Sequence, residues 1–269
     1  ANPISSELSV MRPSLLPNLL AAAARNVDRG FADMALFEVG PQYAGDRPQD
    51  QTTGASGVRR GNTAARHWDK QARPVDAHDA KADALAVLEA AGAPVAKLQI
   101  TSDAPGWYHP GRSGVIRLGP KNQLASFGEL HPRILEAFDL RGPVVGFEVV
   151  LENIPLPKQK TGASRGPLRA SALQPVTRDF AFVIDTAIAA GQLIDAARSA
   201  AVDAALVSIT GISLFDIYAG GRLDAGRKSL AISVTLQPAT RTLTDKEIEA
   251  AASAIVAAVG KSTGAELRG

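Results

Sequence analysis

The sequence contains no cysteine in its 269 residues. This absence excludes disulfides, thiolate metal sites and cysteine nucleophiles together. No apolar run approaches the roughly 20 residues of a membrane-spanning helix, and the start, Ala1-Asn2-Pro3-Ile4, lacks the basic and apolar segments of a signal peptide. We therefore expect a soluble, cytoplasmic protein. Because the chain begins without Met inside what looks like folded sequence, we also expect it to be part of a longer one.

An excess of charge of one sign is also missing. The chain has 29 Lys and Arg against 27 Asp and Glu, a net charge of +2 that does not by itself indicate nucleic-acid binding. Hydrophobic residues make up 45% and charged residues 21%, which argues against collagen-like, wholly disordered and coiled-coil proteins. At roughly 100 to 200 residues per domain, the length predicts two domains or one large one.

The small basic surplus lies in one stretch that is rich in proline and glycine. Lys158, Lys160 and Arg165 occur there without any acid, and the sequence on either side is nearly neutral. Such a stretch is typical of a linker, whose charge suits either a solvated loop or contact with a phosphate backbone. The sequence therefore predicts a first domain over 1–155, a basic linker over 156–170 and a second domain over 171–269.

The first domain is expected to be an antiparallel sheet covered by helices. Ser14 is a suitable helix cap, and apolar residues follow it at helical spacing over 15–27, so that this helix packs either inside the fold or on a partner. The polar segment 43–66 has no period and is predicted to be a long, mobile loop. Strands are predicted at 34–40, 97–101, 114–118, 124–128 and 144–150, and helices at 77–91 and 132–140.

The second domain is more regular. The predicted strands at 177–184, 207–218, 228–237 and 265–268 and the helices at 190–201 and 245–259 give the order β-α-β-β-α-β, the ferredoxin-like pattern. Apolar residues alternate with polar ones over 229–236, which predicts a sheet with one face on the helices and the other open to water. An open sheet face of this kind is the binding platform of several RNA-binding modules.

Signals for catalysis are weak. The four histidines, His67, His78, His109 and His131, form no metal-binding pattern, and no glycine-rich phosphate loop follows a strand and opens a helix. Gly220-Gly221 is interpreted as a hairpin turn. His109 and His131 each precede a proline, which predicts extended backbone and either structural hydrogen bonding or contact with a partner. We therefore predict no catalytic residue, no metal site and no cofactor in this chain.

Motifs along nearly the whole chain resemble one family. In order they are NPISSE at 2–7, MRPSLLPNLL at 11–20, LFEVG at 36–40, YHPGRS at 108–113, GELHP at 128–132, PVTRDFAFV at 175–183, FDIY at 215–218, GRKSLA at 226–231 and RTLTDKEI at 241–248. The sequence is similar to the C-terminal portion of the beta subunits of bacterial phenylalanine–tRNA ligases. It departs from the family at 75–81, where the family has a more aromatic run.

The resemblance implies an α+β protein: a class II synthetase-like antiparallel sheet module that is catalytically inactive, followed by a ferredoxin-like βαββαβ anticodon-binding domain. In this family the alpha subunit carries the active site, with ATP and Mg²⁺, and two alpha and two beta subunits form a heterotetramer. The first module would pack against the alpha subunit, and the helix at 15–27 is a candidate for that surface.

The resemblance also implies which residues bind RNA. Tyr218 would stack on an anticodon base, Asp216 and Ser229 would lie near base edges, and Ala181 would lie on the neighbouring strand. Stacking of a base on an aromatic ring is worth roughly 1 to 3 kcal/mol. Phosphates could be contacted by three basic side chains, each of which could instead form an ion pair with a nearby Asp, as Arg178 could with Asp179. These three are Arg178, Lys228 and Arg241.

A function of another class remains open, because regulatory modules that bind amino acids share the β-α-β-β-α-β order. Such a module holds its ligand at an interface between domains. The exposed strand at 215–218 suits base stacking better.

Overall fold

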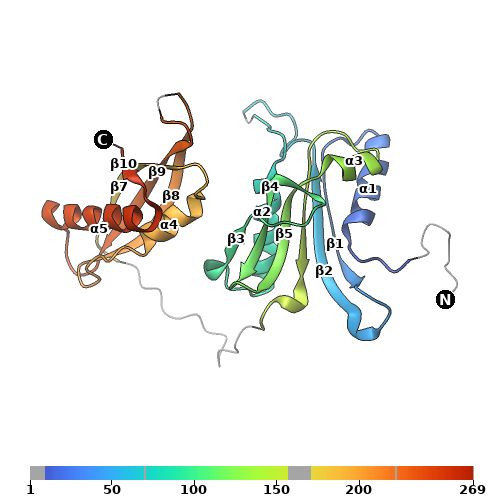
Figure 1. The fold of residues 1–269 in the computed structure, drawn as a ribbon, viewed down its shortest axis with the longest axis horizontal. Helices are drawn as coiled ribbons and strands as arrows, with labels where there is room; N and C mark the ends of the chain where they lie inside the picture. Colours follow the sequence, from blue (N-terminus) through green and yellow to red (C-terminus); the bar gives the residue numbers. More distant parts are fainter. Residues whose placement is uncertain (1–9, 70, 157–170, 222, 269) are drawn as a thin grey trace. The chain divides into compact units, whose positions relative to one another are not determined.

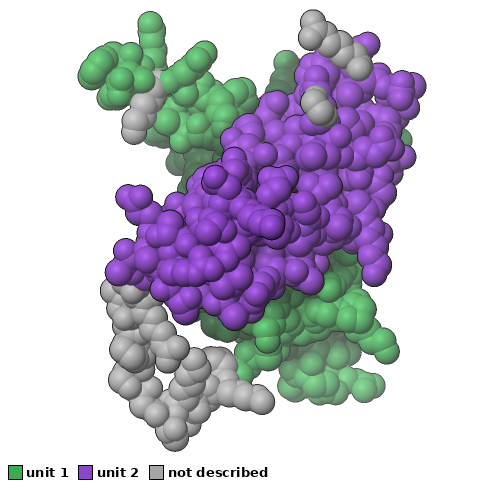
Figure 2. Space-filling view, turned by 90° about the vertical axis from the view of Figure 1, so that its left-hand side faces the viewer, with its two compact units in different colours: residues 1–162 green, residues 163–269 purple. Residues whose placement is uncertain are grey.

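The computed structural model describes residues 10–69, 71–156, 171–221 and 223–268. The chain divides into two compact units, residues 1–162 and residues 163–269, drawn green and purple in Figure 2. This division falls within the predicted linker 156–170, whose residues 157–170 lie outside the described part, as do residues 2–7. Each unit has a sheet of its own (Figure 1). Each also has its own hydrophobic core residues.

The first unit contains a six-stranded antiparallel sheet in the order β1-β2-β6-β5-β4-β3. Its strands are β1 (Met34–Tyr43), β2 (Gln51–Arg60), β3 (Gln99–Thr101), β4 (Tyr108–Leu118), β5 (Asn122–Leu130) and β6 (Val144–Val150). Its helices are α1 (Leu16–Asp28), α2 (Ala77–Ala90) and α3 (Pro132–Ala137), with short 3-10 turns at Pro48–Asp50, Val95–Lys97 and Leu151–Asn153. The strand predicted at 144–150 is thus confirmed, the one predicted at 97–101 is shorter, at Gln99–Thr101, and the predicted hairpin is longer at both ends than expected.

Helices cover both faces of this sheet (Figure 1). On one face α1 and α3 pack on Val58, Leu130 and Val144, and on the other α2 packs on Phe127 and Phe147. Alternate residues of β2, β5 and β6 therefore enter two different cores, whereas the edge strands β1 and β3 contain no buried residue.

Helix α1 buries its apolar face within the first unit. Leu16, Leu19 and Leu20 are each no more than 5% exposed, and Ser14 Oγ accepts a hydrogen bond of 3.0 Å from the N–H of Leu16 at the start of the helix. Each buried leucine contributes roughly 1.5 to 3 kcal/mol. The helix predicted at 15–27 is confirmed, but its apolar face belongs to the core and is not available for a partner.

Strand β2 corrects the loop predicted at 43–66. It pairs with β1 on one side and β6 on the other, so it lies inside the sheet. Its central residues are small because large side chains lie over them: a Cβ added at Gly57 would lie 2.6 Å from Cε1 of Phe147. A strand with small side chains on two covered faces has no apolar alternation, and the sequence therefore looked like a loop.

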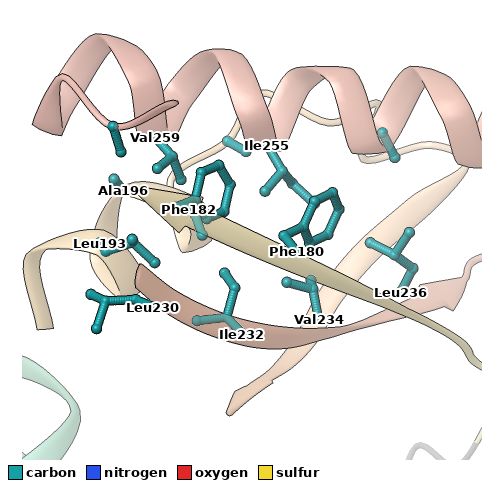
Figure 3. Close-up of a cluster of buried hydrophobic side chains, with 14 of the residues drawn as sticks. Phe180, Phe182, Leu193, Ala196, Leu230, Ile232, Val234, Leu236, Ile255 and Val259 are labelled. Carbon is teal, nitrogen blue, oxygen red and sulfur yellow. The ribbon is translucent and has the colours of Figure 1, made fainter. Parts of the chain in front are cut away.

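The second unit contains an antiparallel sheet in the order β10-β7-β9-β8. Its elements are β7 (Val176–Asp185), α4 (Ala190–Arg198), β8 (Val207–Tyr218), β9 (Arg227–Pro238), α5 (Asp245–Thr263) and β10 (Glu266–Leu267). The predicted ferredoxin-like β-α-β-β-α-β order is confirmed. Figure 3 shows Phe180 and Phe182 of β7 between β9 and Ile255 and Val259 of α5, in a core that also takes Leu193 and Ala196 from α4. Both helices therefore cover the same face.

Among the described residues, no helix is long and apolar enough to cross a membrane.

Candidate nucleic-acid interface

The candidate site is the face of the four-stranded sheet that α4 and α5 leave uncovered. Cross-strand pairing places Val183, Ser229 and Tyr218 side by side in one row across the sheet. It places Ala181, Ala231 and Asp216 side by side in another row, two residues further along the strands. Between these rows lies that of Phe182 and Leu230, which point into the core. Because successive residues of a strand point to opposite faces, the first two rows lie on the open face. The fold thus brings four predicted residues onto one face: Tyr218, Asp216, Ser229 and Ala181.

The end of β8 carries two accessible aromatic side chains, Phe215 and Tyr218. Leu214 pairs with Ile232 and Asp216 with Ala231, so Phe215 is an extra residue in a β-bulge. Such bulges redirect side chains. Phe215 is 58% exposed and Tyr218 36% exposed. A surface with two accessible aromatic rings can stack unpaired bases.

The ring of Tyr218 lies against the turn that follows β8. A Cβ added at Gly220 would lie 2.5 Å from the hydroxyl oxygen and 2.6 Å from Cζ of Tyr218, whereas nothing lies within 4 Å of one added at Gly221. Only glycine at position 220 leaves room for the ring in this place. The glycine pair lies between β8 and β9, where a hairpin turn was predicted.

Ser229 is less accessible than the sequence suggested. It pairs with Tyr218 and Val183 on the open face but is only 4% exposed. In this conformation little of its side chain is accessible to a base edge.

Two predicted basic residues lie on the other face. Arg178 pairs with Val234 and Lys228 with Ile184, and both partners are fully buried in the core that the helices cover. Lys228 Nζ donates a hydrogen bond of 2.9 Å to the carbonyl oxygen of Thr186. The seven predicted residues therefore do not form a single surface, and phosphate contacts by Arg178 and Lys228 would lie away from Tyr218.

The predicted ion pair between Arg178 and Asp179 is absent from those found among the described residues. The two side chains are neighbours in β7 and point to opposite faces.

Arg241 forms an ion pair at the start of α5. Its Nη2 lies 2.6 Å from Oε1 of Glu247 and its Nη1 lies 3.0 Å from Oε2. Glu247 also accepts hydrogen bonds of 2.9 Å from the N–H and the hydroxyl of Thr244, which begins the helix. The Arg241 hydrogen bonds, with smaller effects from Thr244, lower the pKa of Glu247 to about 2. Arg241 was predicted either to contact a phosphate or to form an ion pair with an aspartate. It forms an ion pair, but its partner is Glu247.

Two arginines that the sequence motifs did not indicate also lie at the open face. Arg227 pairs with Asp185 in the row beyond Ser229, and its Nη2 lies 3.6 Å from Oε1 of Glu266 in β10. Arg268 follows β10, and its N–H donates a hydrogen bond of 2.7 Å to the carbonyl oxygen of Ala181. Alternation could have identified Arg227, because it is two residues before Ser229, whereas Lys228 is one residue before it.

His109 and His131 make structural hydrogen bonds. His109 Nδ1 accepts one of 3.1 Å from the N–H of Gly111, and His131 Nδ1 accepts one of 3.2 Å from the N–H of Arg133 at the start of α3. Within the described ranges, no group of three or more His, Asp or Glu side chains could hold a metal ion.

Comparison with known proteins identifies the class of the second unit. Residues 171–268 match the model of the ferredoxin-fold anticodon-binding domain, so the open-faced sheet belongs to that class. Residues 1–151 match the model of the phenylalanyl-tRNA synthetase beta chain CLM domain. This second match covers more than half of the chain, which therefore belongs to the phenylalanyl-tRNA synthetase beta chain family, as its motifs predicted.

Curated relatives support this assignment. The chain is 57% identical over 268 residues to the phenylalanine–tRNA ligase beta subunit of Rhodospirillum rubrum and 54% identical over 269 residues to that of Paramagnetospirillum magneticum. Each alignment covers 100% of this chain and 33% of the relative, so the chain spans about a third of their length. A solved pyrrolysyl-tRNA synthetase of Desulfitobacterium hafniense is 23% identical over 53% of this chain and 46% of its own, with a TM-score of 0.39.

Proposed function

We propose that the second unit binds the anticodon loop of phenylalanine tRNA on its open sheet face. The observation that supports this most is that Tyr218, Asp216 and Ala181 share that face beside the exposed ring of Phe215. Single-stranded bases splayed from a loop stack on aromatic rings and are read by short polar side chains.

Charge on this face is mixed, which limits the affinity. Arg227 and Arg268 supply positive charge near the rows of Ser229 and Ala181, but Asp216 and Glu266 lie close by. Salt-dependent attraction to phosphates grows with the number of contacts. We therefore expect modest affinity for RNA from this chain alone and additional contacts from the rest of the ligase.

The first unit acts, in this proposal, as a non-catalytic scaffold that packs on the alpha subunit of a cytoplasmic ligase. ATP and Mg²⁺ would bind at the alpha subunit, in an assembly of two alpha and two beta subunits. Support comes from the edge strand β1, where Phe37 is 79% and Val39 57% exposed on one face. Adjacent exposed apolar side chains of this kind mark interaction surfaces.

Filter binding of phenylalanine tRNA to the 269-residue chain tests the RNA-binding role. Tyr218→Ala should weaken binding about fivefold or more, since a stacked base contributes roughly 1 to 3 kcal/mol. Phe31→Ala is the control, because Phe31 is an exposed aromatic residue in the first unit, 61% exposed. Equal retention of tRNA by the wild type and Tyr218→Ala would rule out stacking. Calorimetric binding of a free amino acid, without tRNA binding, would favour the regulatory module.

Co-purification with the alpha subunit tests the scaffold role separately. Phe37→Asp should abolish co-purification while leaving tRNA binding by the chain unchanged, because it places a charge on the exposed apolar face of β1. ATP–pyrophosphate exchange by the chain alone would contradict the assignment of the chemistry to the alpha subunit.

A further inference from the structure

A cavity of about 720 Å³ lies on the face of the first sheet that carries α1. Its walls are mainly apolar and come from both the helices and the sheet: Leu16 and Leu20 of α1, Leu124 of β5, Val150 of β6, and Phe138 after α3. Trp107, which is 44% exposed, also lines it. Cavities of roughly 300 to 1,000 Å³ with apolar walls are typical of small-molecule sites.

Glu148 is the one charged side chain among the described residues that line this cavity. Its Oε1 accepts a hydrogen bond of 2.6 Å from the hydroxyl of Ser14. Its Oε2 accepts hydrogen bonds of 2.8 Å from Nε1 of Trp107 and 3.2 Å from the hydroxyl of Tyr108. All three donors are neutral, so they orient the carboxylate without compensating its charge.

The hydroxyl of Tyr108 stays protonated and can act as a hydrogen-bond donor. Burial raises the pKa of its hydroxyl well above the ordinary value, and the nearby carboxylate of Glu148 raises it further. The phenol therefore keeps its proton at neutral pH and continues to donate to Glu148. No ion pair found among the described residues includes Glu148.

The carboxylate can accept another hydrogen bond. An ionised carboxylate has about four acceptor positions, two on each oxygen. Oε2 of Glu148 already accepts two hydrogen bonds and Oε1 only one. The vacant position belongs to Oε1, in a group that already lines the cavity.

We propose that this cavity binds a small molecule in which a protonated amine is attached to an aromatic or similarly apolar body. The ammonium group would donate to Oε1 of Glu148, and the apolar body would pack against Trp107, Phe138 and Leu124. An indole face also attracts a cation. An anion would meet the uncompensated charge of Glu148, and a single carboxylate is too small a ligand set for a divalent metal.

Trp107 provides a direct measure of binding. The chain has two tryptophans, and Trp68 is 91% exposed and does not line the cavity, so a Trp68→Phe background isolates the fluorescence of Trp107. The probe is 2-phenylethylamine, and 2-phenylethanol is its neutral counterpart of similar shape. We expect a saturable fluorescence change with the amine at a concentration about tenfold lower than with the alcohol, because hydrogen bonds between charged groups are the stronger ones.

Glu148→Gln should remove this preference, so that the amine and the alcohol bind equally. Glu89→Gln, on exposed α2 surface, is the matched control and should leave the preference unchanged. Absence of a saturable response of Trp107 to the amine in the folded chain, or equal binding of the two probes to it, would overturn the proposal.

A second variant keeps the test decisive if Glu148→Gln does not fold. Gln42 of β1 lines the same cavity, and Gln42→Glu adds a second negative charge there. This variant should increase the preference for the amine several-fold relative to the alcohol. An unchanged preference in folded Gln42→Glu protein would contradict the proposal.

Discussion

The two sheets of this chain are both antiparallel, but they are covered differently. The sheet of the first unit carries helices on both faces, whereas both helices of the second unit lie on one face of its sheet. In the first sheet the central strands β2, β5 and β6 are therefore buried on both faces, and the binding surfaces proposed above are an exposed edge and a cavity. In the second, alternate strand residues face away from the helices, and several of them, such as Asp179 and Asp216, are exposed. How a sheet is covered thus decides which of its positions can serve in binding.

The largest difference in the effect of substitutions on stability should appear between the two faces of β7. Phe182 is fully buried under α5, so Phe182→Ala should lower the free energy of unfolding of the second unit by about 3 to 5 kcal/mol. Asp179→Ala changes an exposed residue on the open face and should alter it by no more than about 0.5 kcal/mol. Urea unfolding followed by circular dichroism measures both. Similar losses for the two variants would show that the second sheet is also covered on both faces.

A smaller difference in stability should distinguish Gly→Ala substitutions in the two sheets. Gly57→Ala puts a Cβ 2.6 Å from Cε1 of Phe147, and we expect a loss of about 1 to 3 kcal/mol in unfolding free energy. At Gly211 of β8 the nearest atom to an added Cβ is Oγ1 of Thr235 at 3.4 Å, an ordinary contact. Gly211→Ala should therefore cost less than about 1 kcal/mol. Thermal unfolding of the two variants measures this, and a greater loss at Gly211 would contradict the difference in crowding.

A third comparison concerns two adjacent glycines beside the open face. Gly220→Ala should displace the ring of Tyr218 and weaken tRNA binding by about 1 kcal/mol, part of the value of one stacked base. Gly221→Ala has free space and should bind like the wild type. If the glycine acts through the ring, Gly220→Ala should have no further effect in a Tyr218→Ala background. Additive effects in that double variant would refute the positioning role.

The smallest effect concerns pH. The pKa of Glu247 is lowered to about 2 in the folded chain, so the unfolded state binds the proton more readily. Stability from the pairing with Arg241 is therefore fully present above the ordinary glutamate range and is lost as the pH falls from about 4.5 toward 2. Melting temperatures of the wild type and Glu247→Gln should differ at pH 7, and the difference should become progressively smaller as the pH falls from about 4.5 toward 2. A constant difference would show that the carboxylate charge contributes nothing.

Most elements could be predicted from local patterns, and β2 shows where these patterns fail. The strands of the second unit were predicted to within two residues of their bounds because their apolar residues alternate. Strand β2 has no such alternation, since Phe147 and the neighbouring strands leave space only for small residues such as Gly57. Its place in the sheet depends on residues far away in the sequence.

Only some of the predicted site residues lie together on the open face. Tyr218, Asp216 and Ala181 occupy positions that share the open face, as the resemblance implied. Arg178 and Lys228 were predicted as phosphate contacts because of their charge. Each lies two residues before a core residue of its own strand, Phe180 in β7 and Leu230 in β9, and therefore points to the same face as that residue. The alternation of side chains along a strand predicts that Arg178 and Lys228 lie on the covered face and that Arg227 lies on the open face.

The sequence by itself determined the family, the two-unit organisation and the pattern of the second sheet, because motifs and alternation are local properties of a chain. The tertiary structure decided which candidate residues are accessible. Ser229 is buried beside Tyr218, Arg241 is paired with Glu247, and α1 is buried in the core of its own unit. The physical reason is that burial and pairing depend on side chains distant in sequence, whose meeting is fixed only when the sheets and helices pack.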